Sequence, residues 1–210
     1  MVNLVEIQNE VFILPEYSEN NSQEHPLYKG IIAPSNKWID LACDLAEESV
    51  RNGGGPFGAV ILQVDSTTGS VLRYWAASNA VTRQNDPTAH AEINAIRSTC
   101  SSLGVFHLGR ISKASARLFQ PGVLSHCILF SSCEPCPMCY GAISWARIPL
   151  LFFGATRFDA ADNMVGFSDA EIYAELDKPY RSRNIKSFKC SGDKTTLAFN
   201  LWRNIPGIHY

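Results

Sequence analysis

The sequence predicts an α/β protein of three layers, in which helices cover both faces of a mixed sheet of five strands. Two observations carry this prediction. Strand-like and helix-like patterns follow one another in the order β-β-α-β-α-β between about residues 58 and 155. The later strands, "CILFSS" and "PLLFFGA", are continuously apolar, which is typical of strands buried on both faces. A sheet of this kind needs helices on each side.

The composition fits one globular domain and argues against several classes of function. The 210 residues are 46% hydrophobic and 18% charged, with a net charge of −2. No block of Lys or Arg suggests nucleic acid or an anionic membrane as a partner, and no apolar run is long enough to span a bilayer. The first residues lack the pattern of a signal peptide, so a cytoplasmic protein is expected.

The seven cysteines point to a metal rather than to disulfides. Their number is odd, and three of them lie within "CEPCPMC". This spacing is typical of metal ligands in a reduced compartment. The other four cysteines are expected to be small core or half-buried residues.

The chain divides into an extension of residues 1–34 and a domain of residues 35–210. The extension contains "EYSENNSQEHP", which is polar and rich in turn residues, so we expect it to be poorly ordered or draped over the domain. Ser35 is a plausible N-cap for a first helix, which "NGGGPFG" ends. No Gly-Lys-Ser/Thr follows these glycines, so a phosphate-binding loop is not expected.

The remaining elements follow from periodicity and turn signals. "AVILQV" and "VLRYWAAS" flank "DSTTG" and predict a hairpin. Residues 89–103 predict a helix, and "CPMCYGAISWAR" another with a proline in its first turn. Residues 168–180 should be helical, "IKSFKCS" an edge strand and "TTLAFNLWRN" a last helix. Residues 107–126 are expected to form an insertion that is a long loop or partly helical.

His90, Cys136 and Cys139 are the candidate metal ligands. The two cysteines are three residues apart at a helix start, so both sulfurs can point at one spot, where the helix N-terminus favours the thiolate. One imidazole and two thiolates suit zinc and leave a fourth position open for water, as in catalytic sites. Cys133 could complete a closed, structural site. It directly follows a strand and is expected to face elsewhere.

Glu92 is the candidate catalytic residue because it lies two residues after His90 at the same helix start. Zinc can lower the pKa of a bound water from about 15.7 toward 7, and a carboxylate there can move its protons. A lone "HAE" or a lone "PCPMC" is a weak or moderate signal. Their combination, each part before a helix, is the signature of zinc nucleobase deaminases.

Several motifs resemble those of the guanine deaminases in the cytidine-deaminase-like superfamily. They are "GGPFGAVI", "NDPTAHAEINAIR", "SSCEPCPMCYGAISWAR", "FDAADNMVGFSD" and the final "WRN…Y", and the resemblance covers roughly residues 36–210. It implies a cytidine-deaminase-like fold, one zinc ion per chain, and hydrolysis of guanine to xanthine and ammonia. It further implies that Glu92 moves protons from the water to the purine.

The resemblance also implies a set of substrate contacts. Asn79 would anchor the base edge, Phe57 and Trp145 would line the pocket, and Asp159 would face the donor edge of guanine. Ala91, beside the metal ligand, completes the set. Four of them have a structural alternative: Asn79 as a turn-forming asparagine, Phe57 and Trp145 as core aromatics, and Asp159 as a cap of the next helical turn.

The end of the chain is expected to complete a second chain's site. By resemblance, the protein is a homodimer that exchanges residues 196–210, and Tyr210 lines the partner's pocket. The alternative is a frayed terminus.

Other functions remain open at this point. Plant guanosine deaminases share many of the motifs, and tRNA adenosine deaminases and cytosine deaminases share the zinc site. A zinc scaffold without activity is a further alternative, but such a protein has no use for Glu92. We expect a small purine as the partner, with neither a membrane nor a nucleic acid.

Overall fold

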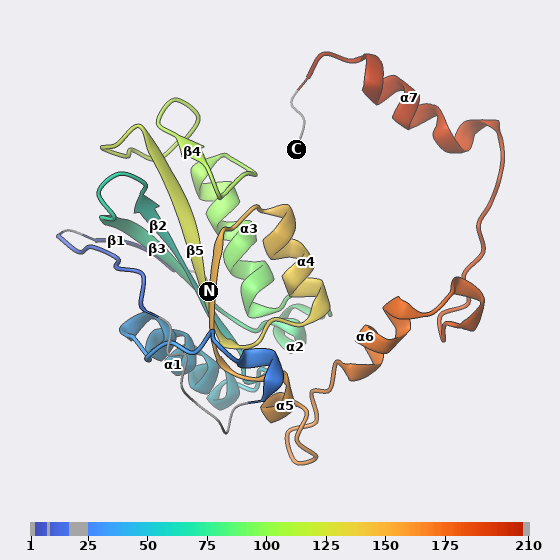
Figure 1. Cartoon of the computed structure of the whole chain (residues 1–210), viewed down its shortest axis with the longest axis horizontal. Coiled ribbons are helices and arrows are strands. Elements are labelled where there is room, and N and C mark those ends of the chain that lie inside the picture. The colour runs from blue at the N-terminus through green and yellow to red at the C-terminus, as the bar shows by residue number, and fades with distance from the viewer. Residues whose placement is uncertain (1–2, 8, 17–24, 208–210) are drawn as a thin grey trace.

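The computed structural model describes residues 3–7, 9–16 and 25–207 and consists of a mixed sheet between helices (Figure 1). The strand order is β1-β3-β2-β5-β4, and β6 pairs with β5. The bounds are β1 Asn3–Glu6, β2 Gly58–Asp65, β3 Val71–Ser78, β4 Ile111–Ser112, β5 Leu124–Cys133 and β6 Leu150–Ala155. The predicted fold class, with helices on both faces of the sheet, is confirmed.

The sheet has six strands where five were predicted, and they are not the same set. β1 comes from the extension and pairs with β3, and β4 comes from the 107–126 insertion and pairs with β5. The predicted edge strand at residues 185–191 is absent. Ile185 and Phe188 there are 79% and 89% exposed, because the segment has left the body and has no neighbouring strand to pair with.

The predicted hairpin of β2 and β3 forms the middle of the sheet. Every residue of β2 is buried, since β3 and β5 flank it on both edges. Asp65 closes the turn by accepting hydrogen bonds from the backbone N–H groups of Thr67 and Thr68, each at 2.9 Å. β5 and β6 run parallel, which requires a crossover, and α4 (Pro137–Trp145) supplies it.

Two apolar cores lie on opposite faces of β2 because side chains alternate along a strand. On one face, Val60 and Leu62 pack with Trp38 and Ala42 of α1 (Lys37–Arg51). On the other face, Ile61 packs in a core that includes residues of α3 (Ala91–Leu103) and α4. This second core fixes the starts of α3 and α4 above the same end of the sheet.

The start of β2 depends on a glycine. A Cβ at Gly58 would lie 2.2 Å from the Ala42 carbonyl oxygen, so only glycine lets β2 begin this close to α1. The predicted helix of α1 is present, but Asn36 caps it rather than Ser35. The Asn36 side chain accepts from the N–H groups of Trp38 and Ile39.

The insertion folds against the sheet through buried polar side chains. Gln63 of β2 donates to the Ser125 hydroxyl at 2.8 Å and to the Gln120 side-chain oxygen at 3.1 Å. Arg73 of β3 donates to the Gln63 side-chain oxygen at 3.1 Å. These bonds satisfy polar groups that would be costly to bury alone.

The chain leaves the body after β6 and forms an extended C-terminal arm, which we define as residues 170–207 (Figure 1). The remaining helices of the chain are α2 Val81–Gln84, α5 Arg157–Ala160, α6 Ala170–Asp177, α7 Leu197–Asn204, and the 3-10 turns η1 Pro26–Tyr28, η2 Tyr180–Ser182 and η3 Asp193–Thr196. The two helices predicted in the arm are thus present, but neither α6 nor α7 buries a residue. In the part of the chain that the structure describes, no helix combines the length and the apolar composition needed to cross a bilayer.

Candidate active site

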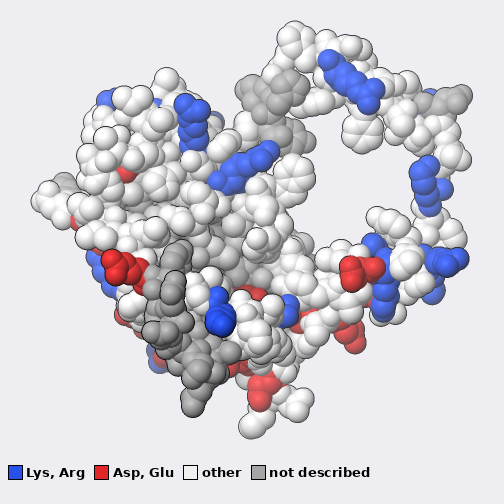
Figure 2. Space-filling view, viewed as in Figure 1, with Lys and Arg blue, Asp and Glu red and all other residues white. Residues whose placement is uncertain are grey.

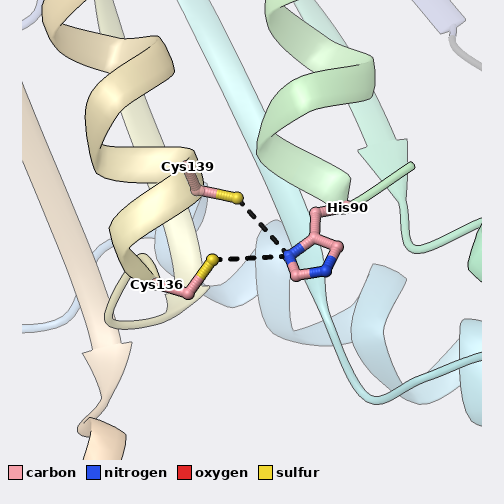
Figure 3. Close-up of side chains that lie close together, drawn as sticks. All are labelled: His90, Cys136 and Cys139. Atoms are coloured by element: carbon pink, nitrogen blue, oxygen red, sulfur yellow. Dashed lines mark hydrogen bonds between the residues drawn. The ribbon is translucent and has the colours of Figure 1, made fainter. Parts of the chain in front are cut away.

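His90, Cys136 and Cys139 meet where α3 and α4 begin (Figure 3). His90 occupies the N-cap position of α3 and Cys136 that of α4, while Cys139 lies one turn into α4. The His90 Nδ1 atom is 3.6 Å from the Cys136 sulfur and 3.5 Å from the Cys139 sulfur. The three predicted ligands therefore come together, although 46 residues separate His90 from Cys136.

The geometry of these atoms fits zinc. Typical bond lengths of 2.0–2.1 Å to nitrogen and about 2.3 Å to sulfur place a nitrogen and a sulfur about 3.6 Å apart around a tetrahedral ion. All three ligand atoms lie within 4.8 Å of one another. Cys133 is not part of this cluster among the described residues. Its sulfur faces the Thr156 carbonyl oxygen at 3.6 Å, as the sequence led us to expect.

The protonation of the cluster also favours a cation. A hydrogen bond from the Cys139 thiol, together with nearby His90, lowers the pKa of Cys136 to about 4. The same hydrogen bond and burial raise the pKa of Cys139, so the two sulfurs share one proton. The Cys136 thiolate raises the pKa of His90. A divalent cation would displace the remaining proton and leave two thiolates and a neutral imidazole as ligands.

Glu92 lies in the first turn of α3, is only 6% exposed, and lines the same cavity as His90. Burial raises the pKa of its carboxyl group, and the nearby Cys136 thiolate adds to the effect. A carboxyl group whose pKa is raised above its usual value holds a proton more readily, as a group that must both accept and donate protons requires.

A cavity of about 460 Å³ opens over the metal cluster. Its floor includes His90, Glu92 and Cys136. Phe57 and Phe167 stand on its walls in an edge-to-face contact, with ring centroids 5.1 Å apart. The volume lies within the range of small-molecule sites, and aromatic walls with a few polar groups are typical of them.

Asn79 also lines the cavity, at the end of β3. It is 5% exposed, and its side-chain oxygen accepts from the backbone N–H of Val81 at 3.1 Å. A Cβ at Gly55 would lie within 3.4 Å of all three outer atoms of the Asn79 amide, so this glycine gives the side chain its room. The predicted contacts Phe57 and Asn79 are thus both at the cavity.

Three other predicted substrate contacts do not line the cavity. Asp159 is not a lining residue. Its carboxylate caps α5 by accepting from the Thr156 N–H and hydroxyl, both at 2.7 Å, which lowers its pKa. Trp145 ends α4 and is 70% exposed, and Ala91 is fully buried at the start of α3. Tyr210 lies outside the described residues.

The structure adds polar lining residues that the sequence did not single out. Glu134, Arg157 and Asp169 all face the cavity. Burial raises the pKa of Asp169, and the Cys136 thiolate raises it further. Glu134 and Asp169 could have been suspected from their places inside "SSCEPCPMC" and at the end of "FDAADNMVGFSD". Nothing local marks Arg157, which reaches the cavity through the path of the chain after β6.

Comparison with known proteins agrees with the fold and the cluster. A family model described as the cytidine and deoxycytidylate deaminase zinc-binding region matches residues 33–155, more than half of the chain. The chain belongs to this family of zinc-dependent deaminases. The match confirms zinc as the metal for which His90, Cys136 and Cys139 are suited.

Within the deaminases, the chain is similar to guanine deaminase. The Bacillus subtilis (strain 168) enzyme is 43% identical over 168 residues, which cover 80% of this chain and 92% of the relative. An X-ray structure of guanine deaminase from Bacillus subtilis aligns with a TM-score of 0.66 and 40% identity, covering 83% of this chain and 96% of the other. The predicted resemblance is confirmed.

Other deaminases are more distant. A tRNA-specific adenosine deaminase of Buchnera aphidicola (subspecies Schizaphis graminum) is 32% identical over 60% of this chain and 69% of the relative.

Proposed function

We propose that this chain hydrolyses guanine to xanthine and ammonia. The observation that carries the proposal is one cavity lined by Glu92, by the zinc ligands His90 and Cys136, and by the aromatic rings of Phe57 and Phe167. The similarity to guanine deaminase over most of both chains supports a purine as the substrate. The reaction consumes one water and releases the C2 amino group as ammonia, with the water oxygen becoming the new carbonyl oxygen.

Zinc, when bound, would acidify the attacking water and so supply a nucleophile at neutral pH. The chain's own residues do the rest. Glu92 accepts one proton from the water and passes it to a ring nitrogen of the purine. It then takes the remaining hydroxyl proton and delivers it to the departing amine, so that both protons of the water are used. The burial of Glu92 suits this role, because a carboxyl group that is shielded from solvent exchanges protons with the substrate rather than with bulk water.

Asn79 and Phe57 remain our proposed contacts to the base, with Asn79 on its polar edge and Phe57 against the ring. Guanine presents donors at N1 and at the C2 amino group, so an acceptor should face them. Asp159 was predicted to be this acceptor, but its carboxylate could face the purine only if it gave up its hydrogen bonds to Thr156 at the start of α5. Asp169 already lines the cavity and is the better candidate.

We further propose that the protein is a homodimer with exchanged C-terminal arms. In one chain, Phe199 and Leu201 of α7 are 66% and 63% exposed, and no residue of α6 or α7 is buried. Such apolar side chains are costly to leave in water and mark a surface that meets a partner. Exchange of an element between identical chains would bury them with contacts that the same sequence provides.

The exchanged arm would also cover groups that one chain leaves open. Trp145, six residues beyond Cys139, is 70% exposed at the end of α4 and would pack beneath the partner's arm. Tyr210 would close the partner's pocket, as the resemblance implies. The free thiols and the zinc thiolates suit a reducing compartment, and we infer that the protein works in the cytoplasm as part of purine metabolism.

One observation favours a second candidate, an RNA substrate. Between Lys178 and Arg203 the arm carries seven basic residues and one acidic residue, and Figure 2 shows blue side chains spaced along it. A basic strip can hold phosphates, and tRNA-specific adenosine deaminases are among the relatives. The shorter match to these relatives makes this the weaker candidate.

Ammonia release from a panel of substrates tests the proposal. Guanine should give a kcat/KM at least about tenfold above guanosine, adenine, cytosine and cytidine, a difference of about 1.4 kcal/mol. The Glu92→Gln variant, prepared identically, controls for contaminating enzymes. A preference for guanosine would assign the chain to the nucleoside deaminases. Activity on a tRNA anticodon stem alone, with steep salt dependence, would favour the RNA substrate.

A further inference from the structure

The N-terminal extension reaches the active site through one tyrosine. Tyr28 lies in η1, before residue 33, where the deaminase family region begins. It is 7% exposed, although its neighbours in the extension are exposed. Its ring packs edge-on against Phe153 of β6 at 6.0 Å and near Phe158 of α5 at 6.4 Å. The extension is therefore anchored to the segment that forms one wall of the cavity.

The Tyr28 hydroxyl donates a hydrogen bond of 2.6 Å to the Glu134 carboxylate. Burial and this carboxylate raise the pKa of Tyr28 to about 12, so the tyrosine keeps its proton and remains the donor at neutral pH. The same Glu134 oxygen accepts from the backbone N–H of Arg157 at 3.0 Å. The Glu134 N–H donates to the Ala155 carbonyl oxygen at 2.8 Å.

Glu134 thus joins three segments that are distant in sequence: the extension, the loop that leads to the zinc ligand Cys136, and the turn between β6 and α5. Glu134 and Arg157 both line the cavity. The Arg157 guanidinium lies over the rings of Phe158 and Tyr173, at 5.1 and 4.6 Å, so its position depends on the same wall. A second contact secures the extension, since His25 packs on Phe158 at 4.6 Å.

We propose that Tyr28 is a positioning residue of the deaminase site. Its hydroxyl holds the Glu134 carboxylate, and Glu134 in turn fixes Arg157, which lines one wall of the substrate cavity. The N-terminal extension then contributes to the geometry of the active site through this contact. A hydrogen bond to a charged group contributes more than one between neutral groups, so the loss of one hydroxyl has a measurable effect. The kinetic part rests on the proposed action on guanine, whereas the structural part does not.

The test removes the hydroxyl and leaves the ring. In zinc-loaded Tyr28→Phe, the Glu134 side chain loses its anchor, and we expect the Arg157 amide to exchange its hydrogen about tenfold faster by NMR, a change of about 1.4 kcal/mol. The KM for guanine should rise severalfold, while kcat changes less than twofold and the zinc content is unchanged. Tyr74→Phe is the matched control, because Tyr74 lies on β3 and does not line the cavity. It should change neither the Arg157 exchange rate nor the KM for guanine.

A double-mutant cycle with Glu134→Ala separates positioning from general stability. If Tyr28 acts through Glu134, adding Tyr28→Phe to Glu134→Ala should change the Arg157 exchange rate and the KM no further. Equal effects of Tyr28→Phe in both backgrounds, or an unchanged Arg157 exchange rate in the single variant, would overturn the proposal. If the wild-type protein does not act on guanine at all, the proposed function fails, and the exchange measurement still decides the role of Tyr28.

Discussion

The replacement Glu92→Gln gives the most informative perturbation of the site. The change keeps the shape of the side chain and removes only its ability to take up and release a proton. General acid–base assistance typically accelerates a step about 10²–10⁴-fold, and Glu92 is assigned to more than one transfer. We therefore expect kcat to fall by at least about 10³-fold, equivalent to about 4 kcal/mol.

The fold should tolerate this replacement. Burial raises the pKa of Glu92 in the folded protein above its pKa in the unfolded chain. The free energy of unfolding therefore falls as the pH rises from the unfolded pKa through the folded pKa, because the buried group must then ionise. A neutral amide does not carry that cost, and the thermal midpoint at pH 7–8 should be equal to or above that of the wild type. The exposed Glu48→Gln on α1 is the matched control, with unchanged kcat and midpoint.

The assay combines xanthine formation with elemental analysis of zinc. The variant should retain one zinc per chain, because Glu92 is not among the three ligands. Turnover within about tenfold of the wild type would remove Glu92 from the mechanism. Loss of zinc from the variant would mean that Glu92 supports the metal site, and the kinetic effect would then say nothing about proton transfer.

Three further predictions concern the metal, the base and the arm. Cys136→Ala should lose zinc and unfold at a lower temperature, whereas Cys133→Ala should retain the metal; the reverse pattern in elemental analysis would refute the ligand set. Asp169→Asn should reduce kcat/KM for guanine by roughly 10- to 100-fold, about 1–3 kcal/mol, and Asp159→Asn less; the opposite order would return the base contact to Asp159. Removal of residues 207–210 should leave the zinc and the dimer intact but strongly reduce turnover, and mixing this truncation with Glu92→Gln should restore some activity if pockets are shared. Sedimentation that shows only monomers in the wild type would contradict the exchange.

The metal site was predictable because its spacing is local. Two cysteines three residues apart at a helix start, and a histidine two residues from a glutamate at another, can point their side chains one way only if each helix begins there. His90 and Cys136 indeed hold the N-cap positions of α3 and α4. Of the two continuously apolar strands, "CILFSS" forms part of β5, which is buried in the sheet. "PLLFFGA" forms β6, which among the described strands pairs only with β5 and is only partly buried, so apolar character alone did not identify the centre of the sheet.

The walls of the cavity were not predictable in the same way. Arg157 precedes the motif "FDAADNMVGFSD" and Asp169 ends it, but the motif does not say which of its side chains faces the cavity. Their position is set by the path of the chain after β6. Asp159, three residues after Thr156, carries a local capping pattern, and that pattern determines its place in the structure. The prediction of a strand at residues 185–191 was wrong for a related reason. Alternating apolar residues indicate that a segment can pair in a sheet, but not that a neighbouring strand is present.

Isotope incorporation tests the central claim most directly. Purified, zinc-loaded protein is incubated with guanine in H₂¹⁸O, and the product and ammonia are measured together. Hydrolysis at C2 predicts xanthine that carries one ¹⁸O atom, formed in equal amount to ammonia, and no reaction with Glu92→Gln. Absence of xanthine, or xanthine without the label, would contradict the assignment of this chain as a zinc-dependent guanine deaminase.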